Sequence, residues 1–443
     1  MTEPTPTPLE CERGQTLPGE IPPDPPRNAS ELEAYLRAFT NFETERTLPT
    51  DRRALGPRRC AALIERASGF PSKTRVIQIA GSKGKGSTTL WIEALLCSRG
   101  ESVVATLSPH LERIEERLRI DGRASTEQEF LASLGSLHEA LTAIDREEPA
   151  LRPTFFDLMT AMAVATAERR GSDWLLLEVG LGGPLDSTSA VPHATGILTT
   201  VDLEHCAQLG NTLPEIAAEK ARIATRGAEF IVFAGAKEDK SALEAACTIA
   251  TERGARVRRV VDDPRIPASL PPPQRGNLAL ALSAVEGGGS APFSSVEVKE
   301  VIESIELPGR LELLAGPQPL LLDGAHTIRS IQHFAARLDQ LRAGKPATIL
   351  VGTMHDKSWR EAFAPLLRDP EVEWIATGTG GPRAANPNEI AALIREHGRS
   401  VEILPLEAAI ERLRAVRDRQ RAVTGSFRLA GAVRRQWLSS KTP

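Results

Sequence analysis

The stretch VIQIAGSKGKGSTTLWIEALL, residues Val76 to Leu96, sets the architecture of the first half of the chain. Val76–Ala80 is a short, mostly apolar run of the length typical of a buried strand. Gly81–Ser87 (GSKGKGS) is a turn of small residues and two lysines, after which apolar residues return at helical spacing. The stretch therefore predicts a strand, a glycine-rich turn and a helix that begins near Ser87.

The composition of the turn favours an anion-binding site. It does not match the Walker pattern, because Ile79 stands where that pattern has its first glycine and Gly86 separates Lys85 from Ser87. Three glycines nevertheless allow successive backbone N–H groups to point into one concavity, and the helix start adds the positive end of its dipole. In such a nest Lys85 would neutralise phosphate oxygens and Ser87 would reach a magnesium ion. A flexible turn without a ligand is the alternative.

Short apolar runs alternate with helical patterns along most of the chain. This alternation indicates an α/β fold with a mainly parallel sheet covered by helices on both faces. A second alternation follows a Gly/Ser-rich stretch near residue 287, so we expect a smaller α/β domain from residue 306. The expected strands are 76–80, 102–106, 174–179, 196–201 and 229–233 in the first domain and 319–322, 348–351, 373–376, 401–404 and 421–423 in the second, with helices at 155–169 and 296–305.

Residues 1–28 differ in composition from the rest of the chain. They contain eight prolines and almost no large apolar residues, so we expect a disordered Pro-rich or extended arm. The first helical pattern follows in ASELEAYLRAF, residues 29–39, with Ser30 as its N-cap. The predicted organisation is an arm over 1–28, a first domain over 29–305 and a second over 306–443.

Overall composition narrows the class of protein. The formal net charge of -4 argues against a dedicated nucleic-acid or anionic-membrane surface, and no apolar stretch approaches the span of a bilayer. The five cysteines are scattered without a CxxC pair, as expected for reduced thiols. The N-terminal residues lack the apolar core of a secretory signal. We therefore expect a cytoplasmic protein with small-molecule partners.

Two polar side chains follow predicted strands and are candidate ligands. Glu178 lies near the end of WLLLEVGLGG, residues 174–183, at the sheet edge where ligands bind in open parallel sheets. A buried carboxylate is costly there unless it meets a cation, either a magnesium–phosphate cluster or a loop arginine. His205 follows the next strand. A lone histidine is more often an ordinary loop or core residue, but beside Glu178 it is a candidate metal ligand.

Eight segments occur in an order that carries a family resemblance. They are GSKGKGS (81–87), SPHLERIEERLRIDG (108–122), TFFDLMTAMA (154–163), LEVGLGGPLDSTS (177–189), LEHCAQLGNTLPEIAAEKA (203–221), LPGRLE (307–312), LLDGAHT (321–327) and TGSFRLAGAVR (424–434). Together they resemble the folylpolyglutamate synthase / dihydrofolate synthase family of the Mur ligase superfamily, over about residues 30 to 435.

The resemblance implies a fold and a reaction. The fold would be an N-terminal P-loop-type ATP-binding domain and a smaller Rossmann-like C-terminal domain, with the active site in the cleft. The implied reaction is ATP-dependent amide formation. A folate or pteroate carboxylate is phosphorylated to an acyl phosphate, the amine of L-glutamate attacks it, and phosphate leaves. Such phosphoryl transfer depends on positioning and charge neutralisation, which accounts for a glycine loop, a lysine and Mg²⁺ beside ATP.

The resemblance also implies roles for individual residues. Gly81 to Ser87 would bind the ATP phosphates, with Lys85 on the phosphates and Ser87 on a first magnesium ion. Lys220 matches a lysine that the family carries as a carbamate, although an ordinary helical lysine is the alternative. Ser108, Glu178 and His205 match ligands of a second magnesium ion, and Asn277 and Arg310 match nucleotide contacts. Asp323 and His326 match residues near the γ-phosphate and the glutamate, and Ser426 matches a contact with the incoming glutamate. Within the loop, the phosphate site is completed by Ser82, Lys83, Gly84 and Gly86.

Several positions depart from the family pattern. The family usually has Thr-Asn where Ser82-Lys83 stand, and Lys83 adds a charge beside the phosphates. The other departures are Glu115 for Asn, Pro184 for Arg, Ser189 for Asn, Glu204 for Asp and Thr327 for Asn. The metal and phosphate residues are retained, whereas the changed residues flank the substrate pocket.

Three functions remain open from the sequence. The first is a ligase that adds glutamate to dihydropteroate, to folates or to both. The second is a divergent Mur-type ligase that joins an amino acid to another carboxylate. The third is a non-catalytic nucleotide-binding regulator, which would not need all of the retained site residues. The sequence does not predict an oligomeric state.

Overall fold

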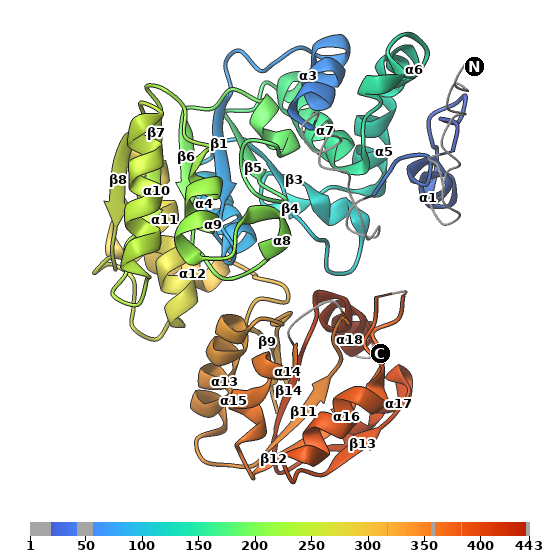
Figure 1. Ribbon diagram of the computed structural model, residues 1–443, viewed down its shortest axis with the longest axis vertical. Helices are drawn as coiled ribbons and strands as arrows, with labels where there is room; N and C mark the ends of the chain where they lie inside the picture. The colour runs from blue at the N-terminus through green and yellow to red at the C-terminus, as the bar shows by residue number, and fades with distance from the viewer. Residues whose placement is uncertain (1–18, 42–55, 317, 356–358, 382, 440–443) are drawn as a thin grey trace, which may run out of the picture.

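The computed structural model describes residues 19–41, 56–316, 318–355, 359–381 and 383–439, which build two sheets flanked by helices (Figure 1). The first sheet has eight strands in the order β4-β3-β2-β5-β1-β6-β7-β8. All neighbours are parallel except the pairs β2–β3 and β3–β4. The strands are β1 Arg75–Ala80, β2 Val103–Thr106, β3 Leu118–Ile120, β4 Arg123–Ala124, β5 Trp174–Glu178, β6 Thr195–Leu198, β7 Glu229–Phe233 and β8 Arg256–Val260.

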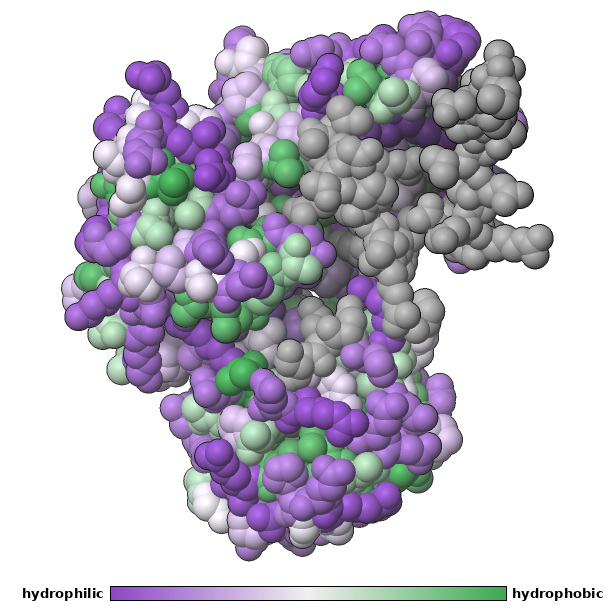
Figure 2. Space-filling model, in the orientation of Figure 1, coloured by the Kyte–Doolittle hydropathy of each residue, from purple (hydrophilic) through white to green (hydrophobic). Residues whose placement is uncertain are grey.

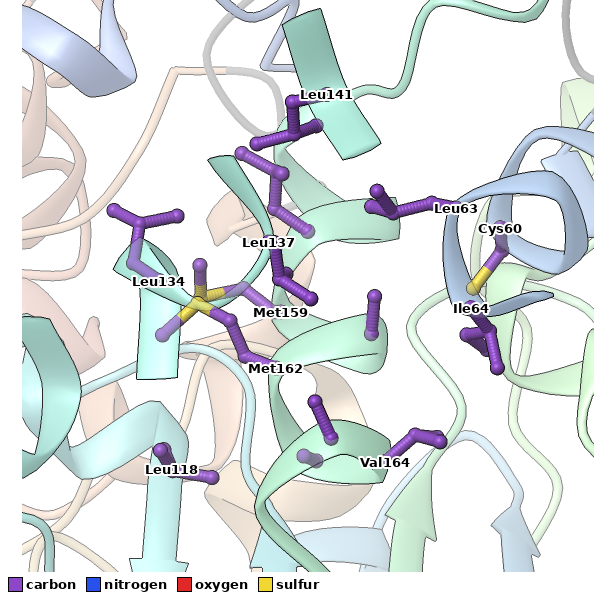
Figure 3. Close-up of a cluster of buried hydrophobic side chains, with 14 of the residues drawn as sticks. Cys60, Leu63, Ile64, Leu118, Leu134, Leu137, Leu141, Met159, Met162 and Val164 are labelled. Atoms are coloured by element: carbon purple, nitrogen blue, oxygen red, sulfur yellow. The ribbon is translucent and has the colours of Figure 1, made fainter. Parts of the chain in front are cut away.

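Helices cover both faces of the first sheet because its strands are apolar on both sides. On one face α3, α5, α6 and α7 pack over Val76, Val104 and Leu175, and Figure 3 shows their side chains, among them Leu63 and Met162, converging in this cluster. On the other face α4, α11 and α12 cover Ile77 and its neighbours. The helices are α1 Ala29–Leu36, α3 Gly56–Ala67, α4 Lys85–Cys97, α5 Glu127–Gly135, α6 His138–Glu147, α7 Phe155–Arg170, α8 Cys206–Leu209, α9 Leu213–Ala221, α10 Lys240–Glu252, α11 Pro272–Gly287 and α12 Ser295–Ser304, with 3-10 turns at Ile114–Arg117, Pro149–Leu151 and Ser187–Ala190.

The second sheet has six strands in the order β13-β12-β11-β14-β10-β9, and β9 alone runs antiparallel to its neighbour. The strands are β9 Glu312–Leu314, β10 Leu320–Leu322, β11 Ala347–Val351, β12 Val372–Ala376, β13 Val401–Ile403 and β14 Gln420–Thr424. The helices are α13 Ile328–Arg342, α14 Trp359–Ala362, α15 Ala364–Leu367, α16 Pro387–Glu396, α17 Leu406–Ala415 and α18 Phe427–Ser439. We propose to treat residues 29–305 and 306–443 as the first and second domains.

A loop of the first domain packs into the second. Leu111 belongs to the apolar cluster built mainly from β10, α17 and α18. Its carbonyl oxygen lies so close to α18 that a Cβ on Gly431 would sit 1.9 Å from it. Beside it, Arg434 Nη1 lies 2.7 Å from Glu112 Oε1, and Arg434 Nε lies 2.8 Å from Glu312 Oε1. These contacts join the two domains on one side of the molecule.

The predicted α/β class and the ten predicted strands are confirmed, with ends that shift by at most three residues. Two predicted helix starts are wrong. The first helix is capped by Asn28, whose Oδ1 accepts from Glu31 N–H at 3.0 Å, and not by Ser30. The helix after the glycine turn begins at Lys85, because Gly84 takes the N-cap position.

The predicted arm is described only in part. Residues 1–18, for which disorder was predicted, lie outside the described residues. Residues 19–27 have no helix or strand, and His138 Nε2 lies 2.9 Å from Pro23 O. Hydrophilic residues predominate on the face drawn in Figure 2, with apolar ones scattered among them. Within the described ranges, no helix is both long and apolar enough to cross a membrane.

Candidate active site

The glycine-rich turn lies at the carboxyl end of β1, between that strand and α4. Gly81 has a φ of 143° and Gly84 a φ of 93°, conformations that residues with a Cβ rarely adopt. Neighbouring side chains also leave no room. A Cβ on Gly81 would lie 1.8 Å from Thr199 Oγ1, and one on Gly84 would lie 2.4 Å from Asn277 Oδ1. Asn277 thus lies against the loop, as predicted, whereas the contact with Thr199 was not predicted.

Two threonines at the end of β6 hold the middle of the loop. Thr199 Oγ1 donates to Lys83 O at 2.7 Å and Thr200 Oγ1 donates to the same oxygen at 3.1 Å. Ser82 N–H donates to Thr200 O at 2.8 Å. The sequence offers no motif for this contact, because it joins segments more than a hundred residues apart.

Three lysines lie at the loop, two within it (Lys83 and Lys85) and one on α9 (Lys220). Lys85 Nζ donates to Gly81 O at 2.9 Å, and Lys220 Nζ donates to the same oxygen at 3.1 Å. Glu204 is shared between two of them, with Lys220 Nζ 3.3 Å from Oε1 and Lys83 Nζ 3.5 Å from Oε2. The structure therefore brings Lys83, Lys85 and Lys220 together at the loop, with Glu204 as the carboxylate that Lys83 and Lys220 share.

Burial and charge set the protonation of this cluster. Burial acts to raise the pKa of Glu204, but the charges of Lys220, Lys83 and Lys85 outweigh it and hold the pKa at about 2. Burial lowers the pKa of Lys220 to about 8, although the charge of Glu204 opposes the shift. Glu204 is therefore an anion at neutral pH, and Lys220 loses its proton more readily than an ordinary lysine.

Glu178 occupies the predicted place at the end of β5, which pairs directly with β1. Its side chain is buried, and its Oε2 accepts from Ser108 N–H at 2.7 Å. Burial raises the pKa of Glu178, while the positive charges of Lys85 and Arg310 oppose the shift. The carboxylate thus lies within the electrostatic field of the phosphate loop, where a cation would lower its desolvation cost.

The four predicted metal ligands are only partly brought together. Ser108 contributes its backbone N–H to Glu178, and Ser87 Oγ accepts from Gln274 Nε2 at 3.4 Å. His205 is exposed, in a left-handed conformation at the start of α8. Among the residues that the structure describes, no three His, Cys, Asp or Glu side chains form a metal cluster. A carboxylate and a hydroxyl flanking the loop nevertheless suit a hard divalent cation.

The second domain brings Arg310, Asp323 and His326 to the same loop. Arg310 packs over the start of α4, where a Cβ on Gly86 would lie 2.7 Å from its Nη2. Asp323 accepts from two backbone N–H groups, and burial raises its pKa to about 7 against the opposing charges of Arg310 and Lys83. His326 Nε2 lies 3.2 Å from Lys83 Nζ. The predicted juxtaposition of the two domains at the phosphate loop is therefore present in the structure.

Ser426 has a different environment from these residues. It is buried, donates from Oγ to Gly352 O at 3.1 Å and accepts there from Leu429 N–H at 3.1 Å. Its hydroxyl therefore caps the start of α18. The contact with incoming glutamate stays a prediction.

Three of the unusual residues fill structural positions. Ser189 Oγ donates to Gly183 O at 2.9 Å and accepts from Gln78 Nε2 at 3.1 Å. Thr327 Oγ1 donates to Asp202 Oδ2 at 3.3 Å, a further direct contact between the domains. Glu115 is buried in the 3-10 turn before β3.

Sequence reasoning missed Gln274, which connects several site elements. Its Oε1 accepts from Trp91 Nε1 at 3.1 Å, and its Nε2 donates to Arg310 O at 3.4 Å as well as to Ser87. It therefore links α4, α11 and the segment that enters the second domain. A glutamine in a helix carries no signal for such a role.

Comparison with known proteins agrees with this geometry. The family model described as "Mur ligase, glutamate ligase domain" matches residues 309–427. A probable bifunctional folylpolyglutamate synthase/dihydropteroate synthase of Halobacterium salinarum is 30% identical over 394 residues, 82% of this chain and 47% of that protein. The chain thus spans about half the length of this relative and of its Haloferax volcanii counterpart, 46% of which it covers.

Relatives of similar length and a solved structure cover most of the chain. The dihydrofolate synthase/folylpolyglutamate synthase of Escherichia coli is 28% identical over 82% of this chain and 86% of its own length. The structure of E. coli FolC in complex with DHPP and ADP superposes with a TM-score of 0.79 at 25% identity, covering 95% of this chain and 100% of that one. The two-sheet fold and the glutamate ligase domain define a Mur ligase. Within that superfamily, the chain belongs to the folylpolyglutamate synthase / dihydrofolate synthase family.

Proposed function

We propose that this protein is an ATP-dependent ligase that joins L-glutamate to the carboxylate of a folate or of dihydropteroate. The observation that carries the proposal is that site residues of the first domain lie beside site residues of the second. The loop Gly81–Ser87 with Lys85 and Glu178 belongs to the first domain, and the second domain places His326 3.2 Å from Lys83 of that loop. A reaction between a nucleotide and two further substrates needs such a meeting point.

The proposed chemistry has two steps. An oxygen of the acceptor carboxylate bonds to the γ-phosphorus of ATP while the bond from that phosphorus to the bridging oxygen breaks, which gives an acyl phosphate and ADP. The neutral amine of glutamate then attacks the acyl carbon, the bond from that carbon to the phosphate oxygen breaks, and an amide, inorganic phosphate and a proton result. Excluding water between the domains would protect the acyl phosphate from hydrolysis.

The residues divide the work between binding and charge neutralisation. The loop N–H groups and the start of α4 suit the nucleotide phosphates, and Lys85 supplies a positive charge beside them. Glu178 and Ser87 would hold Mg²⁺, which supplies a Lewis acid for the phosphoryl oxygens when bound. Ser108 orients Glu178 through its backbone N–H. Asp323 and His326 are proposed to contact the transferred phosphoryl group and the glutamate from the second domain.

The lysine Lys220 is proposed to act as a carbamate, as its place in the family motif implies. Its amine is buried and its pKa is lowered to about 8, so a neutral amine able to react with CO₂ is within reach at physiological pH. The ammonium first loses one proton, and addition of CO₂ to the neutral amine releases a second, so that an anion replaces a cation. Lys220→Ala whose activity is restored by short carboxylic acids would support this role. If no carboxylic acid restored it, the carbamate role would be wrong.

A second candidate, a Mur-type ligase for another carboxylate acceptor, is favoured by one observation. Glu115 is buried near the loop that carries Ser108, and its Oε2 has no hydrogen-bond partner within the described residues. A carboxylate at a position where the family usually has an amide would favour an acceptor with a different pattern of donors.

The test is phosphate release from ATP with Mg²⁺ and L-glutamate, with dihydropteroate, tetrahydrofolate or no acceptor, and mass spectrometry of the products. Release that requires an acceptor, together with a mass gain of one glutamyl residue, would establish the ligase and identify its acceptor. Absence of acceptor-dependent release from folded protein that binds ATP would contradict the folate assignment and favour the second candidate.

A further inference from the structure

Lys83 extends from the phosphate loop to the second domain. Its Nζ lies 3.2 Å from His326 Nε2 and 3.5 Å from Glu204 Oε2. Lys85, two residues later, instead donates to Gly81 O at the base of the loop. The two lysines of GSKGKGS therefore point to different parts of the site, one along the loop and one between the domains.

The backbone of Lys83 is fixed more firmly than that of an ordinary loop residue. Its carbonyl oxygen accepts from Thr199 Oγ1 and Thr200 Oγ1, and the residue forms an isolated β-bridge with Thr200. Its side chain, by contrast, is 26% exposed and reaches from this fixed backbone to His326 and Glu204. A long side chain on a rigid base can follow a ligand over a short distance while its charge stays between the domains.

The hydrogen bonds around His326 define what Lys83 contacts. His326 Nδ1 lies 2.8 Å from Gly324 O, which can only accept, so Nδ1 carries the proton. A lysine ammonium can only donate, so Nε2 accepts from Lys83 and the imidazole is neutral. Lys83 thus holds His326 in one tautomer and keeps its own charge at the domain interface.

The charge balance around Lys83 favours an anionic ligand. Three lysines and Arg310 lie around the loop. Glu204 pairs with Lys83 and Lys220. Glu178 and Asp323 are the other carboxylates within reach of these charges, so the cations outnumber the carboxylates among these groups. The phosphate groups of a nucleotide would neutralise the excess positive charge. Lys83 is the member of this cluster that contacts the second domain, where the acceptor and glutamate are proposed to meet.

We propose that Lys83 is a catalytic residue that binds the phosphoryl group in transfer, in addition to the charge that Lys85 supplies beside the phosphates. This inference rests on the proposed ligase function. Lys83 moves no proton. It stays an ammonium and donates hydrogen bonds to the γ-phosphoryl oxygens while the bond to the carboxylate oxygen forms and the bond to the ADP oxygen breaks. Charge that develops on those oxygens is thereby neutralised from the domain interface, where Lys83 contacts His326.

The test compares two nucleotides in Lys83→Gln, a variant of similar length without the charge. Calorimetric titration should show affinity for AMPPNP lowered about 10-fold or more and affinity for ADP changed by less than about 2-fold, because only AMPPNP has the third phosphate. The turnover number for acceptor-dependent phosphate release should fall on the order of 100-fold. Lys73→Gln, at an exposed lysine ahead of β1, is the matched control and should leave all three values unchanged.

Two outcomes would overturn the inference. Equal weakening of ADP and AMPPNP would mean that Lys83 supports the loop as a whole, and unchanged AMPPNP affinity would mean that it does not contact the third phosphate. Lys83→Arg, which keeps the charge, should retain the preference for AMPPNP; loss of that preference would also contradict the inference. Wild-type protein that binds both nucleotides but releases no phosphate with either acceptor would instead contradict the folate ligase function, and the nucleotide comparison would still test Lys83.

Discussion

Lys220 and Glu204 form an ion pair at the base of the phosphate loop, with Nζ 3.3 Å from Oε1. The same ammonium donates to Gly81 O at 3.1 Å, so the pair ties α9 to the loop. Because Glu204 also faces Lys83, α9 and the loop share one carboxylate. Protonation changes in this pair should therefore be felt in stability as well as in binding.

Stability should depend on pH through Lys220. Burial lowers its pKa from 10.5 to about 8, so between these values the unfolded chain binds more protons than the folded one. The unfolding free energy of the wild type should then rise with pH across this window, relative to Lys220→Met, which has no proton to lose. The measurement is urea denaturation of both proteins from about pH 7.5 to about pH 10 in bicarbonate-free buffer. Lys299→Met, at an exposed lysine paired with Glu303, should show no such trend. A constant or falling difference would contradict the assignment.

Gly84→Ala should abolish nucleotide binding. The new Cβ would lie 2.4 Å from Asn277 Oδ1, and the φ of 93° is strained for alanine. Gly100→Ala is the matched control, because Gly100 has a φ of 76° but no neighbour within 4 Å of its added Cβ. Both variants should lose about 1–2 kcal/mol of stability from the strained backbone. Only Gly84→Ala should lose affinity for ADP in calorimetry. Equal affinity in the two variants would show that the loop tolerates the displacement of Asn277.

Glu178→Gln should separate stability from turnover. The carboxylate is buried and its pKa is raised, so its ionised form costs stability at neutral pH and the amide should be at least as stable. Metal-dependent phosphate release should nevertheless fall on the order of 100-fold, because the amide carries no charge for the cation. Thermal unfolding and a phosphate-release assay measure the two effects.

Glu93→Gln is the control for this variant. Glu93 is also buried, and burial raises its pKa, but it pairs with Arg119 2.6 Å away in a different part of the domain. The control should lose stability, because the substitution would leave the largely buried Arg119 without this carboxylate, and should keep its turnover number. Near-normal turnover in Glu178→Gln would mean that the carboxylate does not hold the metal.

Arg434→Met should weaken the contact between the domains. The substitution removes the cation that bridges Glu112 and Glu312, both largely buried, and leaves Glu112 only the 4.0 Å contact with Arg435 Nε, so we expect a loss of about 3 kcal/mol. Arg412→Met is the control, because its partner Glu402 is well exposed and the loss there should stay below about 1 kcal/mol. Urea midpoints measure both losses. Similar values for the two variants would show that the Arg434 cluster does not stabilise the interface.

The strands that could be predicted are the buried ones, because burial requires apolar residues that form a recognisable run in the sequence. Strands such as β5, with five buried residues, read as continuous apolar runs. The antiparallel strands β3 and β4 are three and two residues long and were missed. At the opposite edge, β8 has the sequence RVRRV, and three arginines on a half-exposed edge strand do not resemble a core strand.

In the site, the residues that could be predicted are those that follow strand ends or belong to sequence motifs. The placement of Glu178 beside the loop follows from the rule that ligands bind at the carboxyl ends of parallel strands. Other contacts depend on how distant segments pack: the hydrogen bonds from Thr199 and Thr200 to the loop, and the contact between Lys83 and His326. No local pattern in the sequence encodes such packing.

The insertion of Leu111 into the second domain limits how this protein can be divided into pieces. A recombinant fragment of residues 306–443 would lack the leucine that lies against Gly431 and fills the cluster beneath α18. The apolar surface that Leu111 covers would be exposed to water or to another copy of the fragment, which would promote aggregation. Ligand screening on the isolated half should therefore supply a peptide spanning residues 108–117. Such a peptide would also be a direct reporter of how tightly the two halves recognise each other.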